Sequence, residues 1–308
     1  MKPISIVFLI ISVILIAAGL LTCSVAKANA SSQGIQLYDV KDDRGEIENT
    51  FDFSNENVGK IEIKVADADV KIVCGADSNK IVINNFSSTG YVCQVENKAL
   101  VMETGFNVLS LTDLAQGEIR FKGFRYYIND FFSGATLAPK SVTVYVSDAF
   151  DIKVISVSTT NGDVSVEGAG YDADIMLSVE NGSISFKDIK TNSSVKGTVK
   201  GSGDITLENV NAHVSEMECE NGTVKGSLTA DEITVNAMSD VELLCGNDME
   251  KYNYDLVAAK GKITLTGVEL QNPHKTHNPN LANKLDIEVQ QGNITITANA
   301  ASGTQPNN

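Results

Sequence analysis

The chain is poor in basic side chains and has no tryptophan. Its 308 residues contain 24 Lys and Arg against 39 Asp and Glu, which gives a formal net charge of −15. The segment 1–30 contains Lys2 and Lys27 and no acidic residue, so the rest of the chain is more acidic still. An acidic body of this kind repels nucleic acid and anionic lipid head groups. Both are therefore excluded as direct partners of the folded part.

Metal-ligating and catalytic residue types are also scarce. His274 and His277 form a His-x-x-His pair in a polar loop. This is half of a zinc site, with no Cys or acid nearby at ligand spacing, so we expect a solvent-exposed insertion there. The segment "GSGD" (201–204) lacks the Gly-Gly-x-Gly-x-Asp spacing of calcium-binding repeats. Beyond the N-terminal segment 1–50 the arginines are Arg120 and Arg125. We expect no metal and no cofactor.

The N-terminus carries an export signal. An apolar run, 4–21, follows the basic Lys2, and small residues follow it up to Ala30. The run is long enough to span a bilayer as an uncleaved helical anchor, which is our first interpretation. The second is a signal peptide cleaved after Ala30, which leads to secretion. A third is a lipoprotein cysteine at Cys23, although Thr22 matches that motif poorly. All three place the body outside the cytoplasm, with Lys2 on the cytoplasmic side.

Four cysteines lie beyond this segment: Cys74, Cys93, Cys219 and Cys245. An even number in an exported chain permits two disulfides. Cys74 with Cys93 is the pair to test, because their separation along the sequence is close to the repeat period described below. The alternative, which we favour, is that each cysteine is a small buried hydrophobic side chain.

Composition divides the chain into four segments. Residues 1–30 are the signal peptide or membrane anchor, and residues 31–50, which are polar and charged, form a stalk. Residues 51–300 are predicted to form a β-strand-repeat domain, because they are rich in Val, Ile, Ser, Thr, Asn, Asp and Gly, and because apolar and polar residues alternate. Residues 301–308 form a disordered tail.

A short phrase returns throughout the second half of the chain: a Gly, a small polar residue, then two apolar residues two apart. Examples are "NGDVSV" (161–166), "NGSISF" (181–186), "GSGDITL" (201–207) and "QGNITI" (291–296). The Gly or its equivalent falls at positions 162, 182, 203, 222, 239, 261 and 292. The spacing is nearly regular until the last interval, which is longer because the polar loop 271–284 intervenes. A fixed period of about 20 residues is typical of stacked repeats.

This period predicts an all-β protein, a β-solenoid similar to a right-handed parallel β-helix, with about eight or nine coils. We expect a glycine to mark the same corner in each coil, where a positive φ lets the chain bend between two strands. These structural repeat positions are Gly162, Gly182, Gly203, Gly222, Gly261 and Gly292. The first apolar residue after each marker is expected to stack into one internal row. The row comprises Val164, Ile184, Ile205, Val224, Val241, Ile263 and Ile294.

The alternative fold is an antiparallel β-meander or sandwich, because Asn-Gly between alternating apolar runs is a strong hairpin signal. A two-residue turn at Asn181-Gly182 would pair Val179 with Ile184, which suits the apolar pattern. The same register around Gly203 would set Lys200 against Ile205, which does not. The hairpin interpretation therefore fits only some repeats.

The repeated Gly-Asp/Ser-Ile-x-Ile phrases, together with the lead-in "KIEIKVADADVKIVCGADSNKIVI" (60–83), resemble the DUF4097 family. This is a bacterial group of β-strand-repeat proteins known by the label "putative adhesin", and the resemblance covers residues 51–297. It implies a β-helix-like fold on the outer side of the membrane and supplies no catalytic residues to carry over. The chain departs from the family pattern in an aromatic stretch (121–132) and in a polar loop (271–284).

Two groups of side chains are candidates for function. Asp163, Asp204 and Asp240 share one repeat position, and stacked carboxylates are what an acid–base enzyme on a β-helix requires. We expect these acids to be solvated turn residues instead. The candidate binding surface lies in the aromatic stretch and comprises Phe124, Arg125, Tyr126, Tyr127, Phe131 and Phe132. Such a cluster suits sugar stacking or protein contact. The other interpretation, which we favour, is that this insertion caps an end or edge of the solenoid.

These observations predict a non-enzymatic, adhesin-like binding scaffold of the cell surface or envelope. Its partner would be a cell-surface glycan or an envelope protein, and its contact with the membrane would be through residues 4–21 alone. A membrane-anchored accessory of envelope-stress signalling is the alternative. A carbohydrate-active β-helix enzyme is the third and weakest interpretation.

Overall fold

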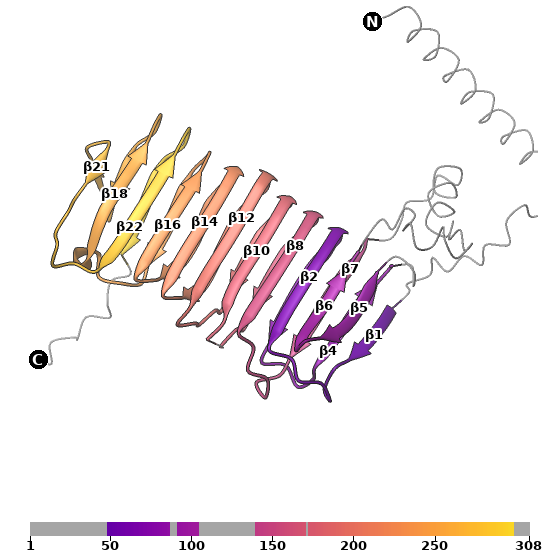
Figure 1. The fold of residues 1–308 in the computed structure, drawn as a ribbon. Helices are drawn as coiled ribbons and strands as arrows, with labels where there is room; N and C mark the ends of the chain where they lie inside the picture. The colour runs from indigo at the N-terminus through magenta and orange to yellow at the C-terminus, as the bar shows by residue number, and fades with distance from the viewer. Residues whose placement is uncertain (1–47, 87–90, 105–138, 171, 299–308) are drawn as a thin grey trace, which may run out of the picture. The chain divides into compact units, whose positions relative to one another are not determined.

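The computed structural model describes residues 48–86, 91–104, 139–170 and 172–298. These residues form two sheets and one short 3-10 helix, η1 (Met249–Lys251) (Figure 1). The 12-stranded sheet has the order β1 (Glu48–Asp52), β4 (Lys80–Asn84), β7 (Ser141–Val146), β3 (Asp69–Cys74), β9 (Val164–Glu167), β11 (Ile184–Lys187), β13 (Ile205–Asn211), β15 (Val224–Thr229), β17 (Val241–Cys245), β23 (Ile294–Ala298), β19 (Ile263–Leu265) and β20 (Val268–Leu270). The 11-stranded sheet has the order β21 (His274–Lys275), β18 (Tyr252–Ala258), β22 (Asn283–Val289), β16 (Glu232–Ala237), β14 (Val214–Asn221), β12 (Ser194–Ser202), β10 (Asp174–Asn181), β8 (Val154–Asn161), β2 (Lys60–Asp67), β6 (Ala99–Glu103) and β5 (Val92–Glu96).

The repeating unit is a coil made of one strand in each sheet. The chain runs along the 11-stranded sheet, turns a corner, and continues in the 12-stranded sheet before it returns for the next coil. Eight coils of this kind are β2–β3, β8–β9, β10–β11, β12–β13, β14–β15, β16–β17, β18–β19 and β22–β23. A ninth, β6–β7, contains residues 105–138 between its two strands. Equivalent strands of neighbouring coils pair in parallel, so the predicted β-solenoid is confirmed.

The hairpin alternative is wrong, because the two strands that flank each Asn-Gly corner belong to different sheets. Val179 pairs in parallel with Thr159 and Val199, not with Ile184. Ile184 pairs with Val164 and Ile205 in the other sheet. The chain can therefore alternate apolar and polar residues on both sides of the corner without forming a hairpin, since each strand turns its apolar side toward the space between the sheets.

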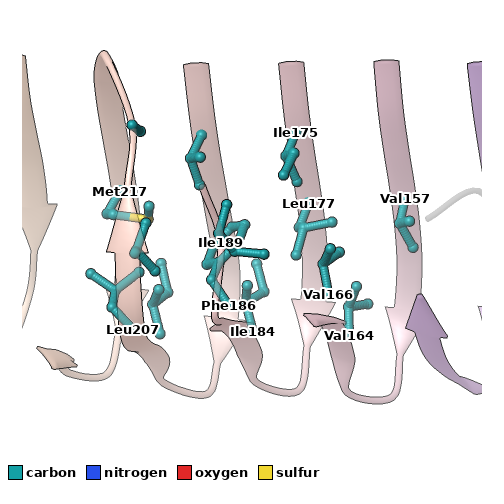
Figure 2. Close-up of a cluster of buried hydrophobic side chains, with 14 of the residues drawn as sticks. Val157, Val164, Val166, Ile175, Leu177, Ile184, Phe186, Ile189, Leu207 and Met217 are labelled. Carbon is teal, nitrogen blue, oxygen red and sulfur yellow. The ribbon is translucent and has the colours of Figure 1, made fainter. Parts of the chain in front are cut away.

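The expected internal row is present and forms part of one hydrophobic core. All seven of its members are at most 1% exposed. Figure 2 shows Val164 and Ile184 of this row beside Val166 and Phe186 from the 12-stranded sheet and Leu177 from the 11-stranded sheet. Because each inward side chain lies over its equivalent in the next coil, a Val or Ile at the same place in every repeat builds a continuous core.

All six repeat glycines lie at the corner between the sheets, and what they share is a close approach of backbones. A Cβ on any of them would lie 1.8–2.4 Å from a backbone atom of the neighbouring coil, a distance that real Cβ atoms do not reach. Positive φ, the reason expected from the sequence, applies to Gly162, Gly182 and Gly203. At the other three glycines the close approach alone excludes a side chain.

The order of the coils departs from the order of the sequence at the C-terminal end. The nearly regular spacing from Ser239 to Gly261 suggests that coil β18–β19 stacks directly on coil β16–β17. Instead, the last coil, β22–β23, lies between them, and Val241 and Ile263 each pair with Ile294. In Figure 1 the yellow strand β22 accordingly lies between the orange strands β16 and β18. Coil β18–β19 is thereby left as the outermost coil.

Antiparallel strands close both ends of the sheets. At one end β4 pairs with β7, β1 pairs with β4, and β5 pairs with β6. At the other end β20 pairs with β19 and β21 with β18. These short strands shield coil edges that would otherwise expose backbone hydrogen-bonding groups. The aromatic stretch 121–132, which we expected to act as the cap, lies outside the described residues, so its role stays a prediction.

The predicted segment boundaries stay predictions as well, because the first and last of them fall in residues outside the described ranges. Between residues 48 and 298, apart from the gaps given above, no helix is long and apolar enough to cross a membrane. The apolar run 4–21 is not among these residues.

Candidate binding surface

The candidate aromatic surface predicted from the sequence, residues Phe124 to Phe132, lies outside the described residues. The points where its insertion leaves and rejoins the solenoid are described. Thr104 Oγ1 accepts a hydrogen bond from the Ala66 N–H at 2.9 Å, and the Asp69 N–H donates to the Lys140 carbonyl at 3.1 Å. Both ends of the insertion are therefore held beside the corner between β2 and β3, in line with the glycine corners of the following coils.

The stacked acids of the corner serve as hydrogen-bond acceptors between coils. Asp163 Oδ1 accepts the backbone N–H of Ser183 at 2.7 Å. Asp204 Oδ1 accepts the Thr223 N–H at 2.8 Å and the Thr223 hydroxyl at 2.9 Å. Each side chain thus satisfies a backbone donor that the bend of the next coil would leave without a partner.

Side chains at the equivalent corner position in other coils accept backbone N–H groups of the neighbouring coil in the same way. Asp69 accepts the Asp163 N–H at 2.9 Å, and Asp240 accepts the Asn293 N–H at 2.7 Å. Asn293 Oδ1 then accepts the Lys262 N–H at 3.0 Å.

The bonds to Thr223, led by the backbone N–H, hold the pKa of Asp204 below the ordinary carboxyl value of 3.8. Carboxylates held in this way by neighbouring backbone suit a structural role rather than proton transfer to a substrate.

The other sequence candidates for metal binding are not brought together. Among the described residues, no three His, Cys, Asp or Glu side chains are placed to hold a metal ion. The His274 ring packs against the Tyr254 ring at a centroid distance of 6.0 Å, and His277 is exposed.

The four cysteines of the body are free thiols. Cys74 and Cys245 are buried, and burial raises the pKa of each to about 12. Cys219 is also buried and Cys93 is half-buried, and desolvation raises the pKa of each to about 11. The Cys74–Cys93 disulfide is therefore absent, and the favoured interpretation of small, mostly buried side chains agrees with the structure. A thiol with so high a pKa is also a poor nucleophile at neutral pH.

Outward side chains of the 11-stranded sheet form a solvent-facing feature that suits a ligand. A shallow depression lies over strands β14, β16 and β22. We call it the acidic face, and the exposed polar side chains that line it are Glu218, Glu220, Asn221, Asn236, Glu288 and Gln290. Glu218 and Glu288 lie in register on either side of Asn236. Two carboxylates therefore flank an amide group in a single row across three coils.

The outer surface of the 12-stranded sheet has a different charge pattern. Lys71 Nζ lies 2.9 Å from Glu167 Oε2, while Lys187 Nζ lies 3.9 Å from Glu167 and 4.0 Å from Glu208. The bond from Lys71 lowers the pKa of Glu167. Charges of opposite sign alternate along this row and neutralise one another, whereas Glu218, Glu220 and Glu288 on the acidic face have the same sign. The acidic face therefore has a net negative charge, which the row of paired charges does not have.

Sequence reasoning missed the acidic face because it depends on the order of the coils. The alternation in "SEMECEN" (215–221) shows that Glu216, Glu218 and Glu220 share the outward side of one strand. That pattern does not show that Glu288 lies two strands away from Glu218. The repeat period of the sequence instead suggests that β18, rather than β22, is the neighbour of β16. The coil β22–β23, which lies between coils β16–β17 and β18–β19, supplies Glu288 and Gln290 and so completes the depression.

Several solved structures match most of the chain at low sequence identity. A "putative cell adhesion protein" from Clostridium sporogenes matches 82% of this chain and 99% of its own at 9% identity, with a TM-score of 0.33. A "putative adhesin" from Bacteroides fragilis matches 82% and 96% at 12% identity, with a TM-score of 0.38. A "putative lipid binding protein" from Parabacteroides distasonis matches 82% and 96% at 13% identity, with a TM-score of 0.34.

No curated protein matches the chain in sequence. A family model, described as Toastrack DUF4097, matches residues 58–303, which include every coil of the solenoid. This match covers far more than half of the chain, and it agrees with the resemblance seen in the repeated corner phrases. The chain belongs to the Toastrack DUF4097 family.

Proposed function

We propose that this protein is a non-enzymatic binding scaffold, displayed on the outer side of the membrane, that makes an adhesin-like contact with the cell envelope through its acidic face. The observation that carries the proposal is the row Glu218, Asn236 and Glu288, where side chains from three coils line one solvent-facing depression. The acids that an enzyme would have needed, Asp163 and Asp204, instead bind the backbone of neighbouring coils.

The chemistry of the acidic face defines the partner it suits. Carboxylate and amide oxygens accept hydrogen bonds, and three carboxylates of the same sign attract cationic groups. A glycan rich in hydroxyl groups or a basic surface of an envelope protein offers such donors. Anionic partners are repelled. Because carboxylates on an exposed sheet are screened by salt, binding through this face should weaken as ionic strength rises.

The test is retention of the soluble body, Ser31 to Asn308, on isolated cell walls and on whole cells. Retention is measured with and without calcium and across a salt series. The variant E218Q/E220Q/E288Q removes the charge of the acidic face and leaves its shape nearly unchanged. The matched control is E48Q/E56Q/E242Q, which removes three exposed carboxylates elsewhere on the chain and gives the same net charge.

Saturable retention that falls strongly in the acidic-face variant and stays at the wild-type level in the control supports the proposal. Equal losses in both variants would show that net charge alone governs binding, and this contradicts a specific role for the acidic face. No retention of the wild-type body under any condition would sink the adhesin-like function. Membrane partners close to residues 4–21, as in the envelope-stress accessory, would then become the leading candidates.

A further inference from the structure

The last coil of the chain fills a slot whose two walls belong to other coils. β22 pairs with β16 on one side and with β18 on the other. β23 pairs with β17 and β19 in the same way. Inward side chains of the inserted coil are fully buried in the slot: Leu285, Ile287, Val289, Ile294 and Ile296. The slot and its occupant recognise each other through parallel backbone pairing, apolar packing and the corner hydrogen bonds of Asn293 to Asp240 and Lys262.

None of these contacts depends on which copy of the chain supplies the coil. Both walls precede the inserted coil in the sequence, and the inserted coil joins the outer wall, β18–β19, to the rest of the solenoid. Without the inserted coil, the edges of β16 and β18 that face it would each expose a row of unpaired N–H and C=O groups. An open strand edge of this kind is a template for any strand of matching pattern. The strand pair that fills the slot in this structure is β22–β23, and an identical pair is available from a second copy of the chain.

The position of the connection before the coil allows β22–β23 to enter the slot of its own chain or the slot of a second copy. The preceding connection, residues 271–282, lies on the surface, and all its side chains are exposed except those of His274 and Leu281, which are half-buried. It is held to β18 by the β21 pairing and by hydrogen bonds of Asn253 to Asn278 and Leu281, so these contacts open when the coil enters the slot of a second copy. An element joined to the rest of the chain by a surface connection is an arrangement in which identical elements can be exchanged between copies.

We propose that the β22–β23 coil can be exchanged between two copies of this chain, so that residues 283–298 of one copy fill the slot of the other. The exchange occurs while the chains fold, because a filled slot must lose the pairing on both of its walls before its occupant can leave. A second copy is therefore a partner of this protein, linked through an interface that repeats the intramolecular one. The linked copies also complete the acidic face, since Glu288 and Gln290 arrive with the exchanged coil.

The first experiment uses two full-length chains with different affinity tags. They are unfolded together in denaturant, refolded together in detergent, and captured through one tag. A second sample is mixed only after each chain has refolded separately. Exchange predicts that the second tag is captured in the first sample and not in the second. While linked copies are the minor species, raising the chain concentration about tenfold during refolding should raise their ratio to monomers about tenfold.

The second experiment locates the linkage. Asn236 and Glu288 are exposed and directly in register on β16 and β22. Parallel neighbours about 4.8 Å apart lie within the Cα range of a disulfide. In the double variant N236C/E288C, oxidation closes a loop within a monomer but joins two chains after exchange. The control S158C/S178C places the same pair on β8 and β10, coils that follow one another directly and are not inserted.

Chains joined through N236C/E288C and not through S158C/S178C, in proportion to the concentration during refolding, support the proposal. Equal covalent dimers in both variants would point to aggregation and overturn it. Capture of the second tag to the same extent whether chains are mixed before or after refolding would assign the association to another contact. Failure to capture the second tag at any concentration would show that each coil always fills its own slot.

Discussion

The ring of Phe186 occupies the space that Gly197 leaves open in the core. Gly197 lies on the inward side of β12, in register with Leu177 and Met217. A Cβ at this position would lie 3.1 Å from Phe186 Cε2 and 3.0 Å from Met217 Sδ. The large side chain from one sheet thus compensates for the missing side chain in the other, and Figure 2 shows Phe186 within the same cluster as Met217.

This relationship predicts that the two positions are energetically coupled. Phe186→Ala should lower the free energy of unfolding by about 3–5 kcal/mol, because it leaves a cavity. Gly197→Ala should lower it by about 1–3 kcal/mol, because Phe186 and Met217 have to shift. In the double variant the new methyl group enters the space vacated by the ring, so the total loss should be about 0.5–3 kcal/mol smaller than the sum. Urea unfolding of all four proteins measures the coupling, and strict additivity would refute it.

The stacked corner predicts a strong effect of adding one methyl group. Gly222→Ala places a Cβ 1.8 Å from the Gly203 carbonyl oxygen, so the coils must move apart at the corner. We expect a loss of unfolding free energy at the upper end of the overpacking range, about 3 kcal/mol. Gly170→Ala is the matched control, because no heavy atom lies within 4 Å of its Cβ position, and it should change stability by less than about 0.5 kcal/mol. Similar thermal midpoints for the two variants would contradict the close approach of the coils.

The corner and the inner row could be predicted from the sequence, while the order of the coils could not. Val164, Ile184 and Ile205 recur at one distance from a glycine, and this local pattern determines which side of each strand is buried. Every coil has the same alternation, so each fits beside any other, and the pattern does not state which coils are neighbours. The antiparallel strands β20 and β21 fix coil β18–β19 at the end of the solenoid, and the remaining coil is then placed inside. The acidic face, which joins Glu218 and Glu288 across β16, follows from that placement.

A buried hydroxyl group in the core predicts a stabilising substitution. Ser215 is 0% exposed, and its hydroxyl has no hydrogen-bond partner among the described residues. It lies in register with Val195 and Ile233, in an otherwise aliphatic row. Ser215→Ala removes the unsatisfied group and should raise the free energy of unfolding by about 1 kcal/mol, as read from the urea midpoint.

The opposite result is expected where a buried hydroxyl is satisfied. The Thr191 hydroxyl donates to the Ala173 carbonyl at 2.9 Å and accepts the Ser193 N–H at 3.0 Å. Thr191→Val keeps the shape but leaves both partners without a bond, so it should destabilise the protein by about 1–3 kcal/mol. If Ser215→Ala instead lowers the free energy of unfolding, the Ser215 hydroxyl has a hydrogen-bond partner in solution and the predicted stabilisation is wrong.

The ladder of corner carboxylates predicts acid sensitivity. The Thr223 N–H and hydroxyl hold the pKa of Asp204 below 3.8 in the folded protein, and unfolding restores the ordinary value. A carboxyl group with a depressed folded pKa contributes stability above its unfolded pKa and loses it as the pH falls toward and through the folded pKa. Asp204→Asn keeps an oxygen that accepts the Thr223 N–H but removes the titration. Asp52, Glu62 and Glu167 have lowered pKa values too, so both proteins should lose stability in acid.

The informative quantity is therefore the difference between wild type and Asp204→Asn. Urea midpoints measured from pH 6 down to about pH 3 should converge as the pH falls below 3.8, because protonation removes the charge-assisted bond that distinguishes the two proteins. At neutral pH the variant should be the less stable of the two, because the Thr223 N–H and hydroxyl then bind a neutral amide oxygen instead of a carboxylate. A constant difference across this range would mean that Asp204 binds Thr223 equally well with and without its charge, and the ladder would then act through geometry alone.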